Sequence, residues 1–328
     1  MNPVISVIIP VYKVEKFVER CTKSLFQQDL IEDVEFIFVD DATPDDSIER
    51  VKNLLEEFPN RKTQTRIICH KVNKGLPDAR NTGLESARGE YVLHVDSDDF
   101  VEPTMLSSML DVARREDADM VWCDWFLDLK HKERRMYEPA FSMPHDAVCA
   151  MLSGGMKFNV WNKLVSRRLY TDNHITFPSG DGMGEDMTMI LLCAHARKIV
   201  HVPEAFYHYI KTNTGAFSQT YSDAHLEQLR HNVNRVSMYL IGHFGNEYTS
   251  MIPFLKLEVK FPFLLIQDKS EKYLKLWTKW YPEVNGFVFK NKTISLRSRM
   301  VQWCASRRLW VFVKMYRYLL NRIVYGKK

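Results

Sequence analysis

The amino-acid sequence predicts an α/β fold, with a mainly parallel sheet that carries helices on both faces and a helical C-terminal region. Short apolar runs rich in β-branched residues alternate with segments of helical spacing in the first half of the chain. Beyond Ser222 the pattern is helical, with little strand signal. The chain has 328 residues, of which 45% are apolar, so it can bury a large core. Repeated strand–helix units of this kind form parallel sheets covered by helices.

The expected elements follow one another from the N-terminus. Residues 4–9 form a continuous apolar run that ends at Pro10, and a segment of helical spacing follows. Short apolar runs also occur in buried helices, but their length and β-branching favour strands here. We expect strands at 4–9, 36–39, 66–70, 91–95 and 120–124, and helices at 14–26, 47–58, 76–87 and 103–115.

Composition divides the rest of the chain. Residues 128–144 are polar, basic and marked by proline, which indicates an exposed connection, and residues 148–209 return to a compact pattern. We therefore expect a first domain over residues 1–215 and a helical, basic region over residues 216–328.

Cysteine usage and hydropathy indicate the cellular compartment of the protein. The six cysteines are scattered and form no Cys-x-x-Cys pair, which fits a reducing compartment and gives no zinc or redox signature. The N-terminus lacks the basic and apolar regions of a signal peptide. No apolar stretch approaches the roughly 18 residues that a spanning helix needs. We expect a cytoplasmic protein.

Positive charge is concentrated at the C-terminal end. Residues 255–328 carry 17 Lys and Arg residues against four Asp and Glu residues, although the whole chain has a net charge of only +4. On an expected helix at about 306–325, the cations Arg307, Arg308, Lys314, Arg317 and Arg322 occupy one half of the helical wheel and apolar side chains the other. This pattern is typical of a helix lying on an anionic membrane.

This helix has two alternatives to membrane binding. Its apolar face could instead pack on the first domain, with its cations in solvent. Nucleic acid is disfavoured, because aromatic residues such as Phe312 and Tyr316 lie on the apolar face rather than among the cations. We expect residues 297–328 to bring the protein to the inner face of the cell membrane.

The expected strand at 91–95 delivers three carboxylates to its C-terminal end, namely Asp96, Asp98 and Asp99. Ligands of open α/β sheets bind at the carboxyl ends of the strands. Clustered carboxylates suit Mg²⁺ or Mn²⁺, ions that usually bind one or two carboxylates together with substrate phosphates. The strand therefore suggests a metal–diphosphate site, although a solvated turn would show the same residues.

Three further strand ends carry residues that suit a nucleotide. Pro10 and Tyr12 follow the first strand, Asp40 and Asp41 follow the second, and Arg80 lies on the segment before the fourth. Each alone has a plainer explanation, such as core packing for Tyr12 or turn formation for the aspartates. Four such groups at successive junctions should nevertheless share one edge of the sheet.

Together these segments resemble the family 2 glycosyltransferases that build bacterial surface polysaccharides. The resemblance covers roughly residues 3–215 in the right order. The segments that carry it are Ser6-Val-Ile-Ile-Pro-Val-Tyr, Glu35-Phe-Ile-Phe-Val-Asp-Asp-Ala-Thr-Pro-Asp-Asp-Ser, Asn73-Lys-Gly-Leu-Pro-Asp-Ala-Arg-Asn-Thr-Gly, Asp96-Ser-Asp-Asp, Gly184-Glu-Asp-Met and Tyr207-His-Tyr. This family has the nucleotide-sugar-binding GT-A fold, inverts the anomeric carbon and uses Mg²⁺ or Mn²⁺.

The resemblance implies a role for each matching residue. A nucleobase site would consist of Asp41, with Asp40 beside it, and Pro10 and Tyr12. Arg80 would lie near the diphosphate or donor sugar, and Asp96 and Asp98 would hold the metal, with Asp98 the direct ligand and Asp99 a turn or helix-start residue. Asp186 would be the catalytic base and Glu185 the fallback, while Trp161, Lys163 and His208 would line the acceptor side. His208 could equally be a packed core residue.

One position departs from the family pattern. Ala42 stands where the family usually has glycine, and alanine adopts positive φ less easily, so the shape of this loop stays open.

The resemblance leads us to expect sugar transfer from a nucleotide sugar, with UDP favoured over GDP or dTDP, to a glycan or lipid-linked glycan acceptor. Two alternatives remain. A sugar-phosphate nucleotidyltransferase would need a Gly-rich, basic loop after the first strand, which Pro10-Val-Tyr-Lys does not supply. A non-catalytic nucleotide-sugar or glycan-binding module would not need Asp96, Asp98 and Asp186.

Overall fold

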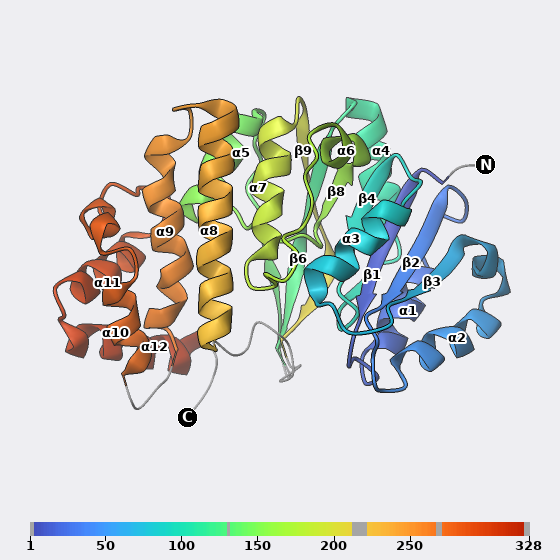
Figure 1. The fold of residues 1–328 in the computed structure, drawn as a ribbon, viewed down its shortest axis with the longest axis horizontal. Helices are drawn as coiled ribbons and strands as arrows, with labels where there is room; N and C mark the ends of the chain where they lie inside the picture. Colours follow the sequence, from blue (N-terminus) through green and yellow to red (C-terminus); the bar gives the residue numbers. More distant parts are fainter. Residues whose placement is uncertain (1–2, 130–131, 212–221, 267–270, 325–328) are drawn as a thin grey trace. The chain divides into compact units, whose positions relative to one another are not determined.

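The computed structural model describes residues 3–129, 132–211, 222–266 and 271–324, and the side chains of residues 321–324 are not included (Figure 1). Two compact units can be distinguished. The first comprises residues 1–146 and 158–236, and the second comprises residues 147–157 and 237–328. The expected boundary at residue 215 lies outside the described residues.

The first unit is built on one mixed sheet (Figure 1). Its strands are β1 (Ile5–Val11), β2 (Val34–Asp40), β3 (Thr65–Cys69), β4 (Tyr91–His94), β5 (Phe100–Val101), β6 (Met120–Leu129), β7 (Lys132–Met136), β8 (Lys163–Ser166) and β9 (Ile199–Ile210). They lie in the order β3-β2-β1-β4-β8-β6-β9-β5, with β7 paired to β6. The strands β1 to β4 run parallel, as predicted, whereas β8 is antiparallel to both of its neighbours.

Helices connect these strands and continue to the end of the chain. The α-helices are α1 (Val18–Phe26), α2 (Ser47–Glu57), α3 (Leu76–Ser86), α4 (Met105–Glu116), α5 (Pro144–Ser153), α6 (Arg167–Asp172), α7 (Thr188–His195), α8 (Asp223–Phe244), α9 (Ile252–Lys260), α10 (Lys272–Lys279), α11 (Leu296–Ser306) and α12 (Trp310–Val324). Short 3₁₀ helices lie at Pro59–Gln64 (η1), Glu185–Met187 (η2), Thr249–Met251 (η4), Phe261–Leu264 (η5) and Pro282–Phe287 (η6). In the part that the structure describes, no helix is both long enough and apolar enough to cross a membrane.

The sequence pattern explains the central strands. All seven residues of β1 are buried, as are all but the last of β2. Strands covered on both faces need continuous apolar runs rather than alternation, because neither face meets water. The predicted α/β architecture is therefore confirmed, and its first four strands lie within two residues of their expected positions.

Two expectations about where elements begin and end were wrong. Residues 128–144 are not simply an exposed connection, because β6 extends to Leu129 and pairs with the additional strand β7. β7 lies at an exposed edge and its sequence is mostly charged, so it lacks the apolar alternation of a half-buried strand. In addition, the C-terminal helix begins at Trp310 instead of about residue 306, because Arg308 takes a positive φ of 57° and separates α11 from α12.

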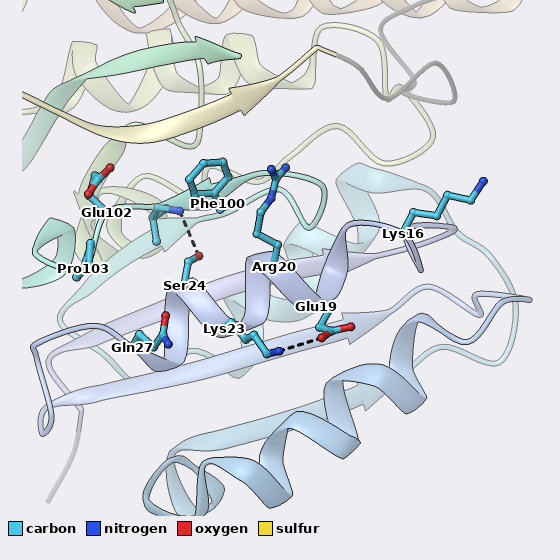
Figure 2. Close-up of a pocket in the computed structure, with 10 residues that line it drawn as sticks. Lys16, Glu19, Arg20, Lys23, Ser24, Gln27, Phe100, Glu102 and Pro103 are labelled. Carbon is cyan, nitrogen blue, oxygen red and sulfur yellow. Dashed lines mark hydrogen bonds and ion pairs between the residues drawn. The ribbon is translucent and has the colours of Figure 1, made fainter. Parts of the chain in front are cut away.

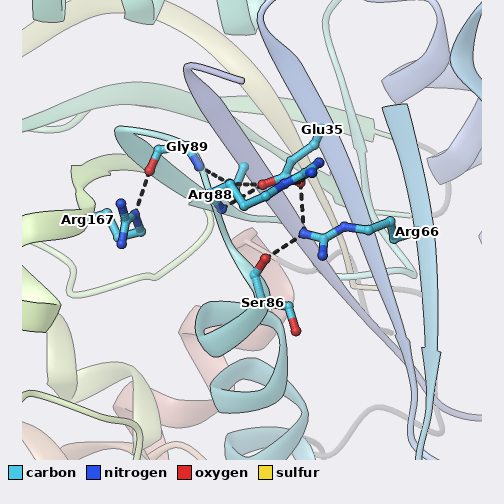
Figure 3. Close-up of polar contacts among 7 residues, drawn as sticks. Glu35, Arg66, Ser86, Arg88, Gly89 and Arg167 are labelled. Atoms are coloured by element: carbon cyan, nitrogen blue, oxygen red, sulfur yellow. Dashed lines mark hydrogen bonds and ion pairs between the residues drawn. The ribbon is translucent and has the colours of Figure 1, made fainter. Parts of the chain in front are cut away.

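A buried carboxylate fastens the first three strands to the turn before β4 (Figure 3). Glu35 on β2 is 1% exposed and accepts hydrogen bonds from Ser6 Oγ (2.7 Å) on β1 and Arg66 Nη2 (2.8 Å) on β3. It also accepts bonds from the backbone N–H and the guanidinium of Arg88. At the next residue, Gly89, a Cβ atom would lie 2.6 Å from the Ser6 nitrogen, so this close approach requires glycine.

Candidate active site

Parallel strands bring the predicted residues to one edge of the sheet. Pro10 lies near the end of β1, and its carbonyl accepts a hydrogen bond of 2.6 Å from Ser97 Oγ, in the loop after β4. Asp41 follows β2 directly, and its N–H donates to the Val11 carbonyl. Tyr12 is 39% exposed at this edge, so its ring is not core packing.

Asp41 fixes the loop that leads into α3. It is only 3% exposed, and its two carboxylate oxygens accept four hydrogen bonds from residues 70–75. The donors are His70 Nδ1, Asn73 Nδ2 and the backbone N–H groups of Lys74 and Gly75, at 2.7–2.9 Å. These contacts give Asp41 a structural function in addition to its predicted role toward the nucleobase.

The neighbouring residues shape the turn after β2. Asp40 is partly exposed, and its Oδ1 accepts a hydrogen bond of 2.8 Å from the Thr43 N–H, as turn-forming aspartates do. Ala42 adopts a φ of 54°, the left-handed conformation that the family's glycine would take without strain. The alanine at this position therefore takes a conformation that glycine adopts more easily.

The three carboxylates in the loop after β4 differ in how deeply they are buried. Asp99 is fully buried, and it accepts hydrogen bonds from Tyr207 Oη (2.8 Å) and the Ile210 N–H (2.7 Å) of β9. Burial raises the pKa of Asp99 well above its usual range, and the charges of Asp98 and Asp96 raise it further. Asp96 and Asp98 are partly exposed, so they are the oxygens that a ligand can reach.

Arg80 joins the two halves of the site. It lies on α3, is 2% exposed, and donates through Nη2 to Asp96 Oδ1 (2.9 Å) and Glu185 Oε1 (3.4 Å). Burial alone would lower the pKa of Arg80, but the charges of Asp96 and Glu185 raise it above its ordinary value, so the cation is permanent. The structure thus brings together three residues that were predicted from separate segments.

The pair of carboxylates at residues 185 and 186 follows a glycine turn. Gly184 has a φ of 89°, and η2 begins at the next residue. Burial raises the pKa of both acids, and the charge of Glu185 raises that of Asp186 further, while Arg80 and Lys163 lower it. A carboxylate with a raised pKa accepts a proton more readily near neutral pH, as a general base must.

Two of the predicted acceptor-side residues are buried. Trp161 is 7% exposed, and its ring stacks on that of Tyr207 with centroids 4.3 Å apart. Lys163 is 1% exposed, and its Nζ donates to the Asn159 carbonyl (2.8 Å) and Asn162 Oδ1 (2.9 Å). Burial lowers the pKa of Lys163 to about 8. These contacts hold both side chains within the packed structure, and an acceptor role for either residue stays a prediction.

His208 is packed between aromatic rings, as one of its two predicted roles required. Its ring stacks on Phe100 at 4.1 Å and on Phe126 at 4.7 Å. Its nitrogens lie 2.7 Å from Glu102 and 3.0 Å from Glu133.

Sequence reasoning missed two residues that hold the site together. Tyr207 bridges the loop after β4, since its Oη donates to Asp99 and accepts the Asp96 N–H at 3.1 Å. The Tyr207-His-Tyr motif marked this residue without giving it a role. His70 binds Asp41, but it looked like the last residue of a strand, and no signal in the sequence distinguishes it.

Comparisons with known proteins show the family of the chain. A profile of the family described as Glycosyl transferase family 2 matches residues 6–184. EpsJ of Bacillus subtilis (strain 168), an uncharacterized glycosyltransferase, is 30% identical over 256 residues, which cover 75% of this chain and 72% of that protein.

Solved structures share the fold. Residues 1–349 of TarS from S. aureus, in complex with UDP-GlcNAc, superpose with a TM-score of 0.67 at 19% identity, covering 100% of this chain and 93% of that chain. The mannosyltransferase PcManGT of Pyrobaculum calidifontis, in complex with GDP-Man and Mn²⁺, gives a TM-score of 0.53 at 13% identity, covering 100% and 89%. The fold is the GT-A fold, and the chain belongs to glycosyl transferase family 2, the nucleotide-sugar-dependent glycosyltransferases.

Proposed function

We propose that this glycosyltransferase moves a sugar from a UDP-sugar to a hydroxyl group of a glycan or lipid-linked glycan, with inversion at the anomeric carbon. The observation that carries the proposal is the buried Arg80 between Asp96 and Glu185, with Asp186 next in the chain. TarS, which shares the fold, was solved with UDP-GlcNAc, and this supports UDP as the nucleotide.

The donor would lie along the edge formed by the ends of β1, β2 and β4. Tyr12 offers an exposed ring to the nucleobase, beside Pro10 and the Asp40–Asp41 turn. Arg80 Nε and Nη1 are buried and have no hydrogen-bond partner among the described residues. Buried donors are rarely left unpaired, so a donor phosphate or sugar oxygen would suit these two groups.

Asp96 and Asp98 fit a divalent cation. In the described part of the chain no group of three His, Cys, Asp or Glu side chains could hold a metal ion. Two reachable carboxylates suffice for Mg²⁺ or Mn²⁺ when a diphosphate supplies further oxygens. When bound, the ion would neutralise charge on the leaving diphosphate. The mannosyltransferase of the same fold that was solved with Mn²⁺ is consistent with this assignment.

Asp186 would act as the general base. Glu185 already binds Arg80, which holds its charge in place, whereas the burial that raises the pKa of Asp186 prepares it to take a proton. An acceptor hydroxyl is a weak nucleophile, so removing its proton during attack lowers the barrier. A single displacement with one base inverts the anomeric carbon.

Donor hydrolysis tests the proposal without a known acceptor. We expect slow, metal-dependent release of UDP from a UDP-sugar, lost in Asp98→Asn and reduced at least 100-fold in Asp186→Asn, as for a typical general base. Asp172→Asn, at an exposed position on α6, is the matched control. UDP binding without turnover by the wild type would indicate a binding module, and nucleotidyl transfer from UTP to a sugar phosphate would indicate the other enzyme class.

We also propose that residues 297–328 contact an anionic membrane. The two helices of this region expose large apolar side chains: Leu296, Met300 and Trp303 on α11, and Val311, Phe312, Met315, Tyr318 and Leu319 on α12. An apolar groove of about 380 Å³ lies between these helices. No acidic residue follows Glu283, so the region carries only positive charge. Exposed apolar area combined with cations favours an anionic lipid surface.

The contacts of α12 determine which of its side chains are available to contact lipid. Val313 is fully buried, and Lys314 pairs with Glu271, so these two residues face their own unit. Arg317 donates to the Ile266 carbonyl. The side chains of Arg322 and Ile323 lie outside the described part. The lipid-facing surface would therefore consist of the exposed apolar residues together with Arg307 and Arg308.

Vesicle sedimentation tests this surface. We expect the full chain to sediment with phosphatidylglycerol vesicles, and Phe312→Ser with Met315→Ser to stay in the supernatant. Val72→Ser is the matched control, because Val72 is 64% exposed on the first unit. Equal sedimentation of the double variant and the wild type would refute the assignment. Binding to neutral vesicles alone would argue against the role of the cations.

A further inference from the structure

We propose that a groove along α1 binds the anionic part of the acceptor, through phosphate or carboxylate groups of a glycan. This inference rests on the proposed sugar transfer and adds a substrate class to it. The groove lies entirely within the first unit, between one face of α1 and the segment that contains β5 (Figure 2). Its volume is about 590 Å³.

The walls of the groove are fixed to each other. Ser24 Oγ on α1 accepts a hydrogen bond of 3.2 Å from the Val101 N–H of β5. Gln28 Nε2, two residues after the end of α1, donates to the Glu102 carbonyl at 2.7 Å. A groove held by such bonds is largely formed before a ligand arrives, which lowers the entropic cost of binding.

The groove has an excess of positive charge. Its cations are Lys16, Arg20 and Lys23, and its acids are Glu19 and Glu102. Glu19 lies 2.9 Å from Lys23, and Glu102 lies 2.7 Å from a histidine ring, so one of the two acids is paired with a cation of the groove. Lys16 and Arg20 have no carboxylate partner within the residues described. The three cations and two acids leave a net charge of +1, and the side chains of Lys16 and Arg20 are exposed in the groove.

Arg20 is held in place by a ring. Its guanidinium lies over Phe100 at 4.4 Å from the ring centroid, and the ring stacks in turn on His208. Figure 2 shows Arg20 directed toward Phe100, with Lys16 extending from the same side of the groove. A guanidinium held on a ring keeps its N–H edges free for a phosphate or carboxylate.

The groove adjoins the donor site. Phe100 follows Asp98 by two residues, and Cys21 Sγ, next to Arg20, lies 3.7 Å from the Asp96 carbonyl. An acceptor whose hydroxyl group reaches the donor sugar could continue along α1. Single-stranded nucleic acid is the less suitable polyanion, because it needs a free aromatic face for base stacking, and Arg20 and His208 lie on the Phe100 ring.

A binding measurement tests the groove separately from catalysis. The probe is a fluorescent phosphodiester-linked glycerol oligomer, followed by anisotropy at low salt. We expect Lys16→Gln with Arg20→Gln to weaken its binding at least tenfold, which corresponds to about 1.4 kcal/mol. Arg20→Lys keeps the positive charge and should therefore retain part of the affinity that Arg20→Gln loses. Lys52→Gln removes a cation on α2 and should leave oligomer binding unchanged. UDP binding should remain at the wild-type level in every variant.

The outcomes separate the alternatives. Equal oligomer binding by the wild type and the double variant would overturn the proposal, and so would a wild type that does not bind the oligomer. Tighter binding of a single-stranded oligonucleotide of equal charge would assign the groove to nucleic acid. Loss of phosphatidylglycerol vesicle binding in the double variant, without loss of oligomer binding, would assign it to lipid. Failure of UDP binding in the wild type would instead count against the proposed function.

Discussion

At the scale of single residues, the site depends on side chains that differ sharply in burial although they are neighbours in sequence. Asp98 is partly exposed and Asp99 is fully buried, yet both are acids of the same turn. The carboxylate of Asp99 is bound by β9, where Tyr207 Oη and the Ile210 N–H both donate to it. The turn therefore presents two carboxylates outward and uses the third to fasten itself to β9.

Tyr207→Phe should loosen this turn. The substitution removes the hydroxyl group that serves both Asp99 and the Asp96 N–H, while the ring keeps its stacking on Trp161. Because a buried acid and a buried N–H lose a partner, we expect about 1–3 kcal/mol of destabilisation. Urea unfolding at an unchanged m-value measures it. The control is Tyr137→Phe, whose side chain is 75% exposed; equal midpoints for the two variants would contradict the role of Tyr207.

At the scale of elements, the turn from Gly184 into η2 sets the direction of the catalytic carboxylates. Gly184 has a positive φ, and a Cβ atom there would lie 3.0 Å from both Leu229 Cδ1 and Met187 Cε. A side chain at this position would therefore strain the backbone and push against packed neighbours. The residues that follow immediately are Glu185 and Asp186.

Gly184→Ala should lower the kcat of sugar transfer by more than its loss of folding stability would explain. We expect a loss of stability of about 1–2 kcal/mol from the left-handed backbone, and a fall in kcat because Asp186 is displaced. Gly180→Ala separates the two effects, since Gly180 has a φ of 77° but no neighbouring atom within 4 Å. Similar kcat values in the two variants would show that the turn does not position the base.

The Glu35 cluster predicts how stability depends on pH. Burial opposes ionisation of Glu35, but the bonds from Ser6 and Arg88 and the charge of Arg66 outweigh it, so the pKa lies below its ordinary value of 4.5. A depressed pKa stabilises the fold above the unfolded-state value, and this contribution is lost as pH falls through the folded-state value.

We expect Glu35→Gln to lower the free energy of unfolding at pH 7 by about 3 kcal/mol, as for a broken buried ion pair. The difference from the wild type should shrink as the pH falls below about 4. Denaturant unfolding across pH 3 to 7 measures it, with the exposed Glu56→Gln as control. A difference that stays constant with pH would show that the charge of Glu35 does not stabilise the fold.

Local pattern accounts for the strands and helices that could be predicted. The apolar runs of β1 and β2 and the spacing of α2 and α3 depend on adjacent residues, and these elements were placed within two residues. The antiparallel insertion of β8 between β4 and β6 is a pairing of distant segments, which no local pattern encodes. β7 was missed because its exposed edge tolerates charge.

In the candidate site, too, the sequence motifs predicted some features, whereas contacts between distant residues were not predicted. The strand-end rule and the family motifs predicted that Arg80, Asp96 and Asp186 serve one site. They did not predict that Arg80 contacts Asp96 and Glu185 at once, since these residues lie 16 and 105 positions away in the chain. Hydrogen-bond partners at such separations are set by the packed structure. For that reason Asp99 was expected to be only a turn or helix-start residue.

At the scale of the whole molecule, donor binding should be visible as a gain in stability. A ligand at 100 times its Kd adds about 2.7 kcal/mol to the free energy of unfolding when it binds only the folded state. We expect UDP with Mn²⁺ to raise the melting temperature more than GDP or dTDP with Mn²⁺. Asp98→Asn should abolish the part of the shift that requires Mn²⁺. An equal shift with all three nucleotides would contradict selection of the uracil base.

Arg80 has a consequence for the order of events in the catalytic cycle. One guanidinium is shared by a carboxylate of the donor side and a carboxylate beside the base. A divalent cation bound at Asp96 would compete with Arg80 for that carboxylate and leave Arg80 more fully to Glu185. Because the charge of Arg80 lowers the pKa of Asp186, donor loading that moved Arg80 toward Glu185 would favour the ionised form of Asp186. Sequential kinetics with the nucleotide sugar as the leading substrate are the expected outcome, and product-inhibition patterns would reveal them.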